Sequence, residues 1–317
     1  MSYATFSASR SDTKSFINCA RGGLVDEEAV AAAITSGHLG GAAFDVFSKE
    51  PAFESPLFGL GNVVCTPHLG ASTREAQENV AIQVAEQMTD FLKRGAVSNA
   101  LNAPSLTAEE VPLLSPWIKL SEVLGGFVGQ VTESAIKEVE IEFAGGVREF
   151  NASPLVAAVT SALLMPLVGR GSVNMVSAPI IARKRGIKIS EVRRDSFGVF
   201  ESYIRLKVVT EKHVRSIAGT IYSDGRPRFI QIKGINLEAE PQEFMLYTTN
   251  TDRPGYIGAL GTVLGNLKVN IGTFALGRSE KNGQAIALLG VDDIITDEIL
   301  KKVRDLPQVV NAHSIVF

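Results

Sequence analysis

The sequence predicts an α/β protein with more than one domain, and two patterns support this prediction. In residues 1–100, short apolar runs of strand length alternate with amphipathic helical spacing. In residues 243–317, strand-like and helix-like patterns follow one another in the order β-α-β-β-α-β. The chain of 317 residues, 45% hydrophobic and 21% charged, is long enough to bury two or three cores.

The first region contains three apolar runs that predict parallel strands, at residues 16–19, 42–46 and 63–65. A helix is expected from about Glu27 to Ser36, because Asp26 can cap its amino terminus. An open parallel sheet collects its reactive groups outside the carboxyl ends of its strands. Polar residues that follow the three runs are therefore expected to meet in one crevice. These residues are Arg21, Glu50 and His68.

Each of these polar residues also has a purely structural interpretation. A lone histidine such as His68 at a strand end is more often a satisfied polar group than a catalyst. Arg21 could pair with Asp26, although the two glycines after Arg21 would leave its loop open for close approach of a ligand. Glu50, before a proline, could be an ordinary turn carboxylate, and Asp45 could cap the end of the second strand.

A long amphipathic helix with one apolar face is expected from Thr73 to about Lys93, where the first region ends. A linker follows at 94–106, before a mixed middle region. The basic residues at 183–185 and 193–194 are expected to form a solvated helix face, with an anion-effector site as the minority alternative. The expected helices of the middle region lie at 118–132, 154–164 and 176–185, and its strands at 136–143, 203–209, 214–222 and 229–233, with a hairpin across 223–227.

The last region predicts a ferredoxin-like fold from its order of elements. Strands are expected at 244–248, 270–276, 285–291 and 309–316, and helices at 256–267 and 296–303. Gly255 stands at the amino terminus of the first of these helices, where free N–H groups and the helix dipole favour a carboxylate. The expected domains are therefore 1–100, 101–240 and 241–317, with residues 1–15 as a disordered leader.

Composition disfavours several other functions. A net charge of −3 gives no electrostatic reason to expect nucleic acid or an anionic membrane as a partner. Cys19 and Cys65 fall on expected core strands, which favours a buried reduced pair over a disulfide or metal site. Pro154 and Pro166 interrupt the uncharged segment Ala152–Gly169, so we expect a buried helix there and not a membrane span. The four histidines show no ligand spacing, and no amino-terminal apolar run could serve as a signal peptide, so we expect no metal and a cytoplasmic location.

Three motifs of the first region carry a specific resemblance. They are Asn18-Cys19-Ala20-Arg21-Gly22-Gly23-Leu24-Val25-Asp26, Asp45-Val46-Phe47-Ser48-Lys49-Glu50-Pro51 and Thr66-Pro67-His68-Leu69-Gly70. In this order and at this spacing they resemble the second half of the nucleotide-binding domain in the D-isomer-specific 2-hydroxyacid dehydrogenase family. From about Ile17 to Phe317 the chain resembles the long-chain branch of that family. The resemblance implies a partial Rossmann-like domain, an intervening α/β domain and a C-terminal ferredoxin-like module of the amino-acid-sensing ACT type.

The resemblance also implies an activity, the NAD-dependent oxidation of 3-phosphoglycerate to 3-phosphohydroxypyruvate that opens L-serine biosynthesis. His68 would exchange the hydroxyl proton, Glu50 would orient and charge-tune that histidine, and Arg21 would hold the substrate carboxylate and polarise the carbonyl. The nicotinamide end of NAD would be lined by residues of the same motifs. They are Cys19, Ala20, Arg21, Asp45, His68, Leu69, Gly70 and Ala71.

The segments Asn250-Thr251-Asp252-Arg253-Pro254-Gly255-Tyr256-Ile257-Gly258 and Val269-Asn270-Ile271 carry the resemblance to the ACT module. They imply that L-serine binds at the interface of a homodimer, or of a homotetramer. The residues implied are Asn250, Asp252, Gly255 and Asn270, and their polar groups are expected to gather near the start of the helix at 256–267. Asn250 and Asp252 could instead only shape the turn before the proline. Asn250 also stands where a histidine is expected in serine-sensitive relatives.

The sequence has no complete dinucleotide fingerprint. Gly59-Leu60-Gly61 and Gly169-Arg170-Gly171 lack the third glycine and a following helix. Because the family's Gly-rich half and its amino-terminal substrate segment are not in this sequence, we expect a truncated enzyme without turnover of its own. Three interpretations stay open: a dehydrogenase, a non-catalytic serine-binding regulatory or oligomerisation fragment, and an inert fragment that exposes a strand edge.

Overall fold

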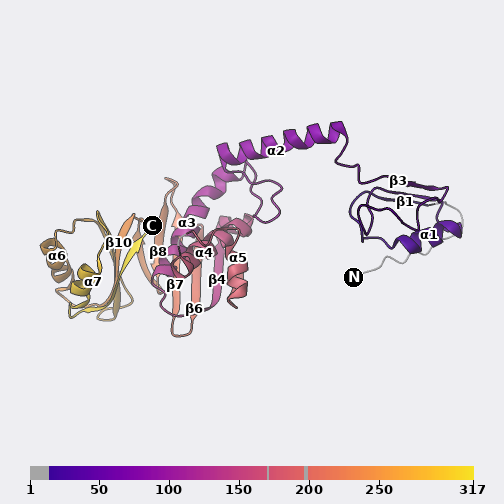
Figure 1. Cartoon of the computed structure of the whole chain (residues 1–317). Helices are drawn as coiled ribbons and strands as arrows, with labels where there is room; N and C mark the ends of the chain where they lie inside the picture. Colours follow the sequence, from indigo (N-terminus) through magenta and orange to yellow (C-terminus); the bar gives the residue numbers. More distant parts are fainter. Residues whose placement is uncertain (1–13, 170, 196–198) are drawn as a thin grey trace. The chain divides into compact units, whose positions relative to one another are not determined.

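The computed structural model describes residues 14–169, 171–195 and 199–317, so that nearly all of the expected leader at 1–15 lies outside the described residues. The chain divides into two compact units (Figure 1). Met1–Thr89 is called the amino-terminal unit below, and Asp90–Phe317 the carboxyl-terminal unit.

The amino-terminal unit is built on three short parallel strands. Its elements are β1 (Ser15–Asn18), α1 (Glu27–Thr35), β2 (Gly41–Phe44) and β3 (Val63–Cys65). The strands pair in the order β1-β2-β3, and all four elements lie within two residues of their expected positions, which confirms them. Asp26 caps α1, because its carboxylate accepts a hydrogen bond from the N–H of Ala29 at 3.0 Å.

The core of the amino-terminal unit is small. Ala42, Phe44, Phe47 and Leu57 are buried, and side chains of α1 pack against them. The buried cysteine pair that the sequence suggested is wrong, because Cys19 is exposed and Cys65 is only half-buried. The physical reason is that β1 is an edge strand that ends at Asn18, one residue before Cys19.

The long helix α2 (Arg74–Arg94) confirms the expected amphipathic helix. Within its 21 described residues none is buried, and Val80, Met88 and Phe91 are all more than half exposed. The division between the two units, after Thr89, falls inside this helix. The apolar spacing therefore predicted the helix correctly, although the large apolar side chains of the helix are exposed.

The carboxyl-terminal unit begins with a six-stranded sheet covered on one face by helices. Its elements are α3 (Val111–Gln130), β4 (Ile136–Ala144), the 3-10 turn η1 (Gly145–Glu149), α4 (Ala152–Val168), α5 (Ala178–Lys184), β5 (Lys188–Arg194), β6 (Tyr203–Thr210), β7 (Val214–Ile221), β8 (Pro227–Ile232) and β9 (Ile235–Ala239). The strand order is β5-β4-β6-β7-β8-β9, and only the β4–β5 pair is parallel. Figure 1 shows α3 and α4 lying along one face of this sheet.

Several expectations for this region need correction. The strands β5 and β9 were not expected, and α4 continues through Pro166 to Val168. Arg193 and Arg194 lie on β5 and not on a helix face, and Arg194 approaches the Glu142 carboxylate at 3.5 Å. The reason is that β5 is an edge strand whose partners are charged side chains of β4, so it carries no apolar signal. Among the described residues, no helix is long and apolar enough to cross a membrane.

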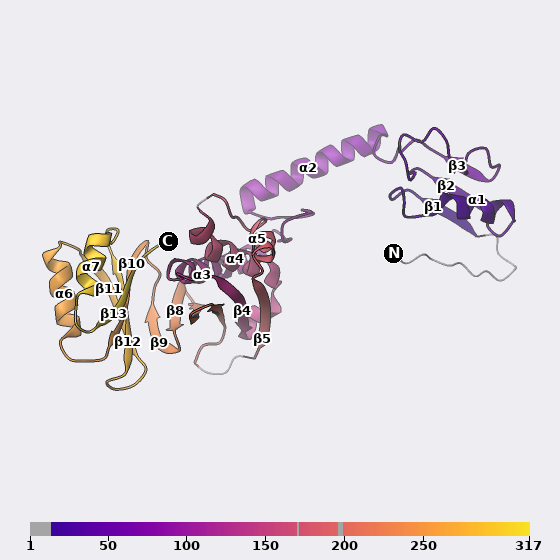
Figure 2. The same ribbon diagram turned by 60° about the horizontal axis from the view of Figure 1, so that its bottom comes forward.

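The last part of the chain confirms the expected β-α-β-β-α-β order. Its elements are β10 (Phe244–Thr251), α6 (Tyr256–Asn266), β11 (Ile271–Arg278), β12 (Gln284–Val291), α7 (Asp297–Arg304) and β13 (Val309–Val316). The antiparallel sheet has the order β11-β12-β10-β13, which is the ferredoxin-like arrangement. Both helices lie on the same face of this sheet (Figure 2).

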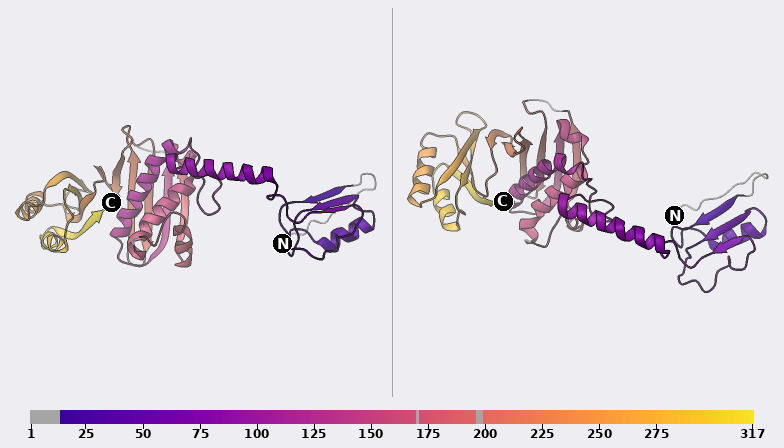
Figure 3. Two further views of the ribbon diagram at one scale, coloured as in Figure 1. Left: turned by 45° about the horizontal axis from the view of Figure 1, so that its top comes forward. Right: turned by 90° about the horizontal axis from the view of Figure 1, so that it is seen from above.

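The other face of the four-stranded sheet shares a core with the six-stranded part. The ring of Phe127 in α3 lies 5.1 Å from that of Tyr247 in β10 and 5.6 Å from that of Phe229 in β8. Gln130 at the end of α3 donates to the carbonyl of Val316 at 3.0 Å and accepts from its N–H at 2.9 Å. Figure 3 shows the carboxyl terminus beside α3. The carboxyl-terminal unit is therefore continuous across its two sheets.

Candidate active site

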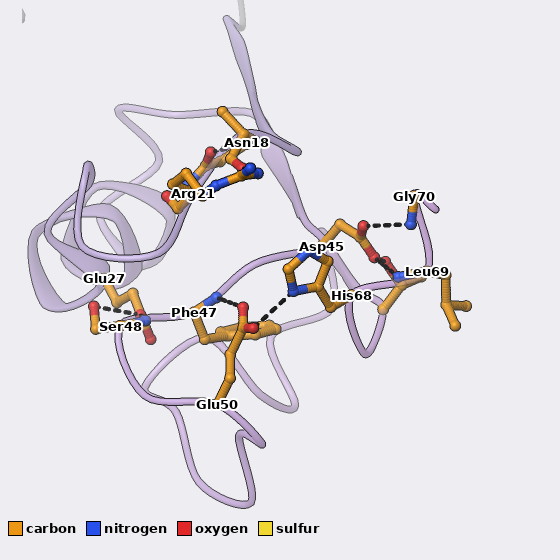
Figure 4. Close-up of polar contacts among 12 residues, drawn as sticks. Asn18, Arg21, Glu27, Asp45, Phe47, Ser48, Glu50, His68, Leu69 and Gly70 are labelled. Atoms are coloured by element: carbon orange, nitrogen blue, oxygen red, sulfur yellow. Dashed lines mark hydrogen bonds and ion pairs between the residues drawn. The ribbon is translucent and has the colours of Figure 1, made fainter. Parts of the chain in front are cut away.

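A histidine and a glutamate meet at the carboxyl edge of the small parallel sheet. His68 follows β3, and its Nδ1 lies 2.7 Å from Oε2 of Glu50 (Figure 4). The second oxygen of Glu50 accepts a hydrogen bond from the N–H of Phe47 at 3.0 Å. The bond to His68 and then that N–H lower the pKa of the Glu50 carboxyl, against a smaller opposing effect of burial. Glu50 therefore shapes its turn and also holds the histidine.

Asp45 fixes the turn that carries His68. Its carboxylate accepts hydrogen bonds from the hydroxyl of Thr66 at 2.5 Å and from the N–H groups of Leu69 at 2.7 Å and Gly70 at 2.9 Å. The Thr66 hydroxyl first, and then the Leu69 N–H, lower the pKa of Asp45. His68 itself has a φ of 56°, an uncommon backbone conformation for a residue other than glycine. Asp45 thus does more than cap a strand, since it holds His68 in this conformation.

Arg21 lies in the loop after β1, at the same edge of the parallel sheet as His68. Its guanidinium donates to the carbonyl of Ala20 at 2.7 Å, and Asn18 donates to the carbonyl of Arg21 at 3.3 Å. Among the described residues Arg21 forms no ion pair with Asp26, whose carboxylate caps α1.

Gly22 has a different purpose from the expected one. A Cβ at this position would lie 1.8 Å from the carbonyl oxygen of Phe47. The missing side chain therefore lets the loop after β1 pack directly against the loop after β2, and it does not keep space for a ligand. The interpretation of Gly22 as a residue that opens the loop is corrected accordingly.

A cavity of about 640 Å³ opens beside the His68–Glu50 pair. Its walls include the aromatic side chains of Phe47, Phe53 and Phe58, and His68 and Glu50 supply polar groups. Because Glu50 takes Nδ1, any proton exchange of the histidine with a bound molecule falls to Nε2. The arrangement suits acid/base chemistry on a small organic molecule.

The remaining cofactor candidates lie in two loops of the same unit. Cys19 and Ala20 follow β1, and Leu69, Gly70 and Ala71 follow His68. Their contacts with NAD stay a prediction. Within residues 14–169, 171–195 and 199–317, no group of three or more His, Cys, Asp or Glu side chains is placed to hold a metal ion.

The candidate effector residues lie in the ferredoxin-like part. Asn250 is buried in β10, where its Nδ2 donates to the carbonyl of Thr251 at 3.2 Å. Its Oδ1 is buried without a hydrogen-bond partner among the described residues. Asp252 accepts hydrogen bonds from Arg278 at 3.0 Å and from the N–H of Asn282 at 3.1 Å. Gly255 caps α6 with a φ of 92°.

Asn270 lies elsewhere within the same chain. It precedes β11 and donates to the Asp292 carboxylate at 2.7 Å. Both β10 and β11 are antiparallel to β12, so they are parallel to each other, and Asn270 stands at the opposite end of the sheet from Asp252. The structure therefore does not bring Asn270 to the start of α6 within one chain, as the sequence had suggested.

The sequence analysis did not predict the contacts of Glu27, nor the hydrogen bond that the Thr66 hydroxyl donates to Asp45. The carboxylate of Glu27 reaches Ser48 and Ser55, which lie on either side of Glu50. The only hint in the sequence was that two serines flank the catalytic candidate Glu50. Their common partner, Glu27, lies 21 residues from Ser48 and 28 residues from Ser55 along the chain. No local pattern reveals such a contact.

Comparison with known proteins shows which families the sequence resembles. Residues 113–233 match the sequence model of the D-3-phosphoglycerate dehydrogenase intervening domain, and residues 1–70 match that of the D-isomer specific 2-hydroxyacid dehydrogenase NAD binding domain. A D-3-phosphoglycerate dehydrogenase of Synechocystis sp. is 38% identical over 304 residues, which are 96% of this chain and 55% of the relative. That of Bacillus subtilis is 36% identical over 299 residues, 94% of this chain and 57% of the relative.

A solved structure, a probable 2-hydroxyacid dehydrogenase from Rhizobium etli, is 40% identical over 25% of each chain, with a TM-score of 0.22. The chain spans about half the length of the curated relatives that it matches. Along nearly all of its own length, however, it is related in sequence to the D-3-phosphoglycerate dehydrogenases, and it carries segments that match their intervening domain and the NAD-binding domain of the wider D-isomer-specific 2-hydroxyacid dehydrogenase family.

Proposed function

We propose that this chain carries the acid/base centre of an NAD-dependent D-3-phosphoglycerate dehydrogenase, which oxidises 3-phosphoglycerate to 3-phosphohydroxypyruvate. The observation that supports the proposal best is the 2.7 Å contact between His68 Nδ1 and Glu50 beside an open cavity. Residues 1–100 would form part of the catalytic domain, 101–240 the intervening domain and 241–317 an ACT-type regulatory domain.

The residues of the site suggest how each would act. His68 would take the proton of the substrate hydroxyl at Nε2, because Glu50 holds Nδ1 and stabilises the resulting imidazolium. Arg21, at the same edge of the sheet, would bind the substrate carboxylate by charge-assisted hydrogen bonds.

Bound NAD would supply the hydride acceptor at its nicotinamide end. The exposed loops after β1 and β3 fit this end of the cofactor, since Cys19, Ala20 and Leu69 lie outside the carboxyl ends of the strands. The sequence supplies no G-x-G-x-x-G loop for the pyrophosphate. We therefore expect the isolated chain to show no turnover of 3-phosphoglycerate with NAD above background.

A chimaera tests the catalytic proposal. Residues 14–317 of this chain replace the matching segment of the Synechocystis relative, and NADH formation from 3-phosphoglycerate is followed. We expect activity that His68→Ala lowers by about 10²-fold or more, the usual range for loss of a general acid/base. His38→Ala, at an exposed turn after α1, is the matched control and should change little. A folded, active chimaera that is insensitive to His68→Ala would overturn the proposal.

We further propose that the ferredoxin-like part binds L-serine between two copies of the chain, in a homodimer or within a homotetramer. Asn250 Oδ1 is a buried acceptor without a partner among the described residues, and an ammonium group would supply the missing donor. β11 is an edge strand with exposed Phe274 and Leu276. If two copies pair β11 antiparallel about a two-fold axis, Asn270 of each copy comes to the end of the sheet where Asp252 of the other lies.

Calorimetry with L-serine and the full chain tests this second proposal. We expect heat of binding that Asn250→Ala removes, because the buried acceptor is lost. Asn266→Ala, at the exposed end of α6, is the control and should bind like the unmodified chain. An absence of heat at millimolar L-serine, or equal binding by Asn250→Ala, would leave this region as an assembly element only.

A further inference from the structure

We propose that Glu27 is a positioning residue of the active site, which acts through Ser48 and Ser55 to hold the loop that presents Glu50 to His68. The inference rests on the proposed function, because it assigns Glu50 and His68 to the reaction. It concerns a side chain on α1 that touches neither the cavity beside His68 nor the histidine itself.

The geometry is that of a carboxylate clamp. Oε1 of Glu27 accepts hydrogen bonds from the N–H of Ser48 at 2.8 Å and from its hydroxyl at 2.9 Å. Oε2 accepts from the hydroxyl of Ser55 at 2.7 Å. Ser48 and Ser55 stand at the two ends of the loop that contains Glu50. Figure 4 shows Glu27 reaching Ser48 on one side of this loop while Glu50 faces His68 on the other.

The charge of Glu27 strengthens the clamp. Partial burial opposes ionisation of Glu27, but the Ser48 N–H and the two serine hydroxyls outweigh it and lower its pKa. The carboxylate is therefore ionised at neutral pH, and hydrogen bonds to an ionised acceptor are roughly twice as strong as neutral ones. An exposed loop with few buried apolar contacts depends on such bonds for a fixed shape.

Glu27 also joins the two sides of the site. It lies in the first turn of α1, directly after the loop that carries Arg21. Gly22 of that loop packs against the Phe47 carbonyl, at the start of the Glu50 segment. A site is most accurate when its groups are supported from a rigid element by second contacts of this kind. Through Glu27 and Gly22, the Arg21 loop and the Glu50 loop share one support.

A simpler explanation is that Glu27 only places negative charge at the amino terminus of α1, which favours any helix. Glu28, the next residue of the same turn, is exposed and would serve that purpose equally. The helix-dipole explanation predicts similar effects of removing either glutamate. The clamp predicts that only removal of Glu27 affects Glu50.

The test is an NMR titration of the Glu50 side-chain carboxyl in the full chain, which needs neither NAD nor turnover. In the unmodified chain we expect Glu50 to titrate below the usual range of a glutamate. In Glu27→Ala we expect its titration to move up toward that range. Glu27→Gln should restore part of the shift, because its amide oxygen can accept from Ser48 and its amide nitrogen can donate to the Ser55 hydroxyl.

Two controls complete the experiment. Glu28→Ala should leave the Glu50 titration unchanged. Ser55→Ala removes one arm of the clamp and keeps the rest, so it should give a smaller shift even if Glu27→Ala does not fold. An unchanged titration in folded Glu27→Ala and in Ser55→Ala would overturn the inference alone. A Glu50 that titrates normally in the unmodified chain would overturn the proposed His68–Glu50 pair, and the inference with it.

Discussion

Around His68, two carboxylates have separate tasks. Asp45 binds the backbone on the far side of the histidine, at Leu69 and Gly70, and so fixes the turn. Glu50 binds the imidazole itself. The sequence motifs indicated both carboxylates, but only the geometry separates the one that positions the backbone from the one that holds the side chain.

Gly22 offers a direct test of loop packing. Gly22→Ala places a methyl group 1.8 Å from the Phe47 carbonyl oxygen, so the backbone must shift. We expect a loss of about 1–3 kcal/mol in the unfolding free energy of the amino-terminal unit, as for overpacked sites. Gly61→Ala is the control, since its Cβ would meet no atom within 4 Å and its φ is not positive. Equal denaturant midpoints for the two variants would contradict this account.

His313 predicts a pH dependence of the carboxyl-terminal unit. Its ring stacks on Tyr247 at 6.2 Å, and burial lowers its pKa below the usual value of about 6.5. The nearby charges oppose one another, since Glu133 raises this pKa whereas Arg215 and Arg304 lower it. Below pH 6.5 the unfolded chain binds a proton that the folded chain does not, so folding stability is full above this pH and falls as the pH drops through and below it.

The measurement is the unfolding free energy between pH 7.5 and 5. We expect a decline toward pH 5 that is absent in His313→Gln. His213→Gln, at an exposed position, should keep the decline. A His313→Gln chain with an undiminished pH dependence would show that another group is responsible. The carboxylates Asp224 and Asp252 titrate below their usual range and do not interfere in this window.

Among the secondary-structure elements, β11 is an edge strand of the ferredoxin-like sheet that carries two exposed apolar side chains, Phe274 and Leu276. If this edge pairs with a second copy, Leu276→Lys places a charge in the interface and should convert the dimer to a monomer. Val310→Lys is the matched control, because Val310 is an exposed residue on β13, at the opposite edge. Light scattering after gel filtration measures both. A monomeric unmodified chain at micromolar concentration would contradict the proposed interface.

The elements that the sequence predicted well are those whose apolar period reflects burial on one side. β10, β12 and β13 are of this kind, because helices or strands cover their faces. The strand β5 was missed because its residues are mostly charged or exposed and it pairs with glutamates of β4. Tertiary pairing, and not local pattern, makes it a strand.

The sequence also predicted only those features of the candidate site that depend on local pattern. Motif spacing placed Arg21, Glu50 and His68 at one sheet edge, because parallel strands end together. It did not reveal Glu27 or the packing of Gly22 on Phe47, since both depend on contacts between separate loops. It also placed Asn270 near α6, whereas the register of β11 puts it at the other end of the sheet.

At the scale of the whole chain, the two units differ greatly in their cores. Among its described residues, the amino-terminal unit buries four hydrophobic side chains in its core cluster, whereas the two sheets of the carboxyl-terminal unit share a much larger core. We therefore expect two calorimetric transitions, with the amino-terminal unit melting first. Phe127→Ala should lower the melting temperature of the second transition only, because this ring joins both sheets. The expected loss in the unfolding free energy of the carboxyl-terminal unit is about 3–5 kcal/mol.

Gly22→Ala serves as the reciprocal control, since it should lower the melting temperature of the first transition only. A Phe127→Ala chain in which the ferredoxin-like part keeps its own unchanged transition would show that the two sheets fold independently. A single transition for the unmodified chain, affected equally by both substitutions, would contradict the division into two units.

The shared core has a consequence for how such proteins evolve. A domain can be exchanged by recombination only if the remaining domain stays folded when its former interface is exposed to water. Here the loss of the ferredoxin-like part would remove Tyr247 from Phe127, remove Phe317 from Phe229, and leave Gln130 without the backbone of Val316. The two sheets are therefore expected to be inherited as one piece, and lineages that lose one of them should replace these three residues by polar or smaller ones.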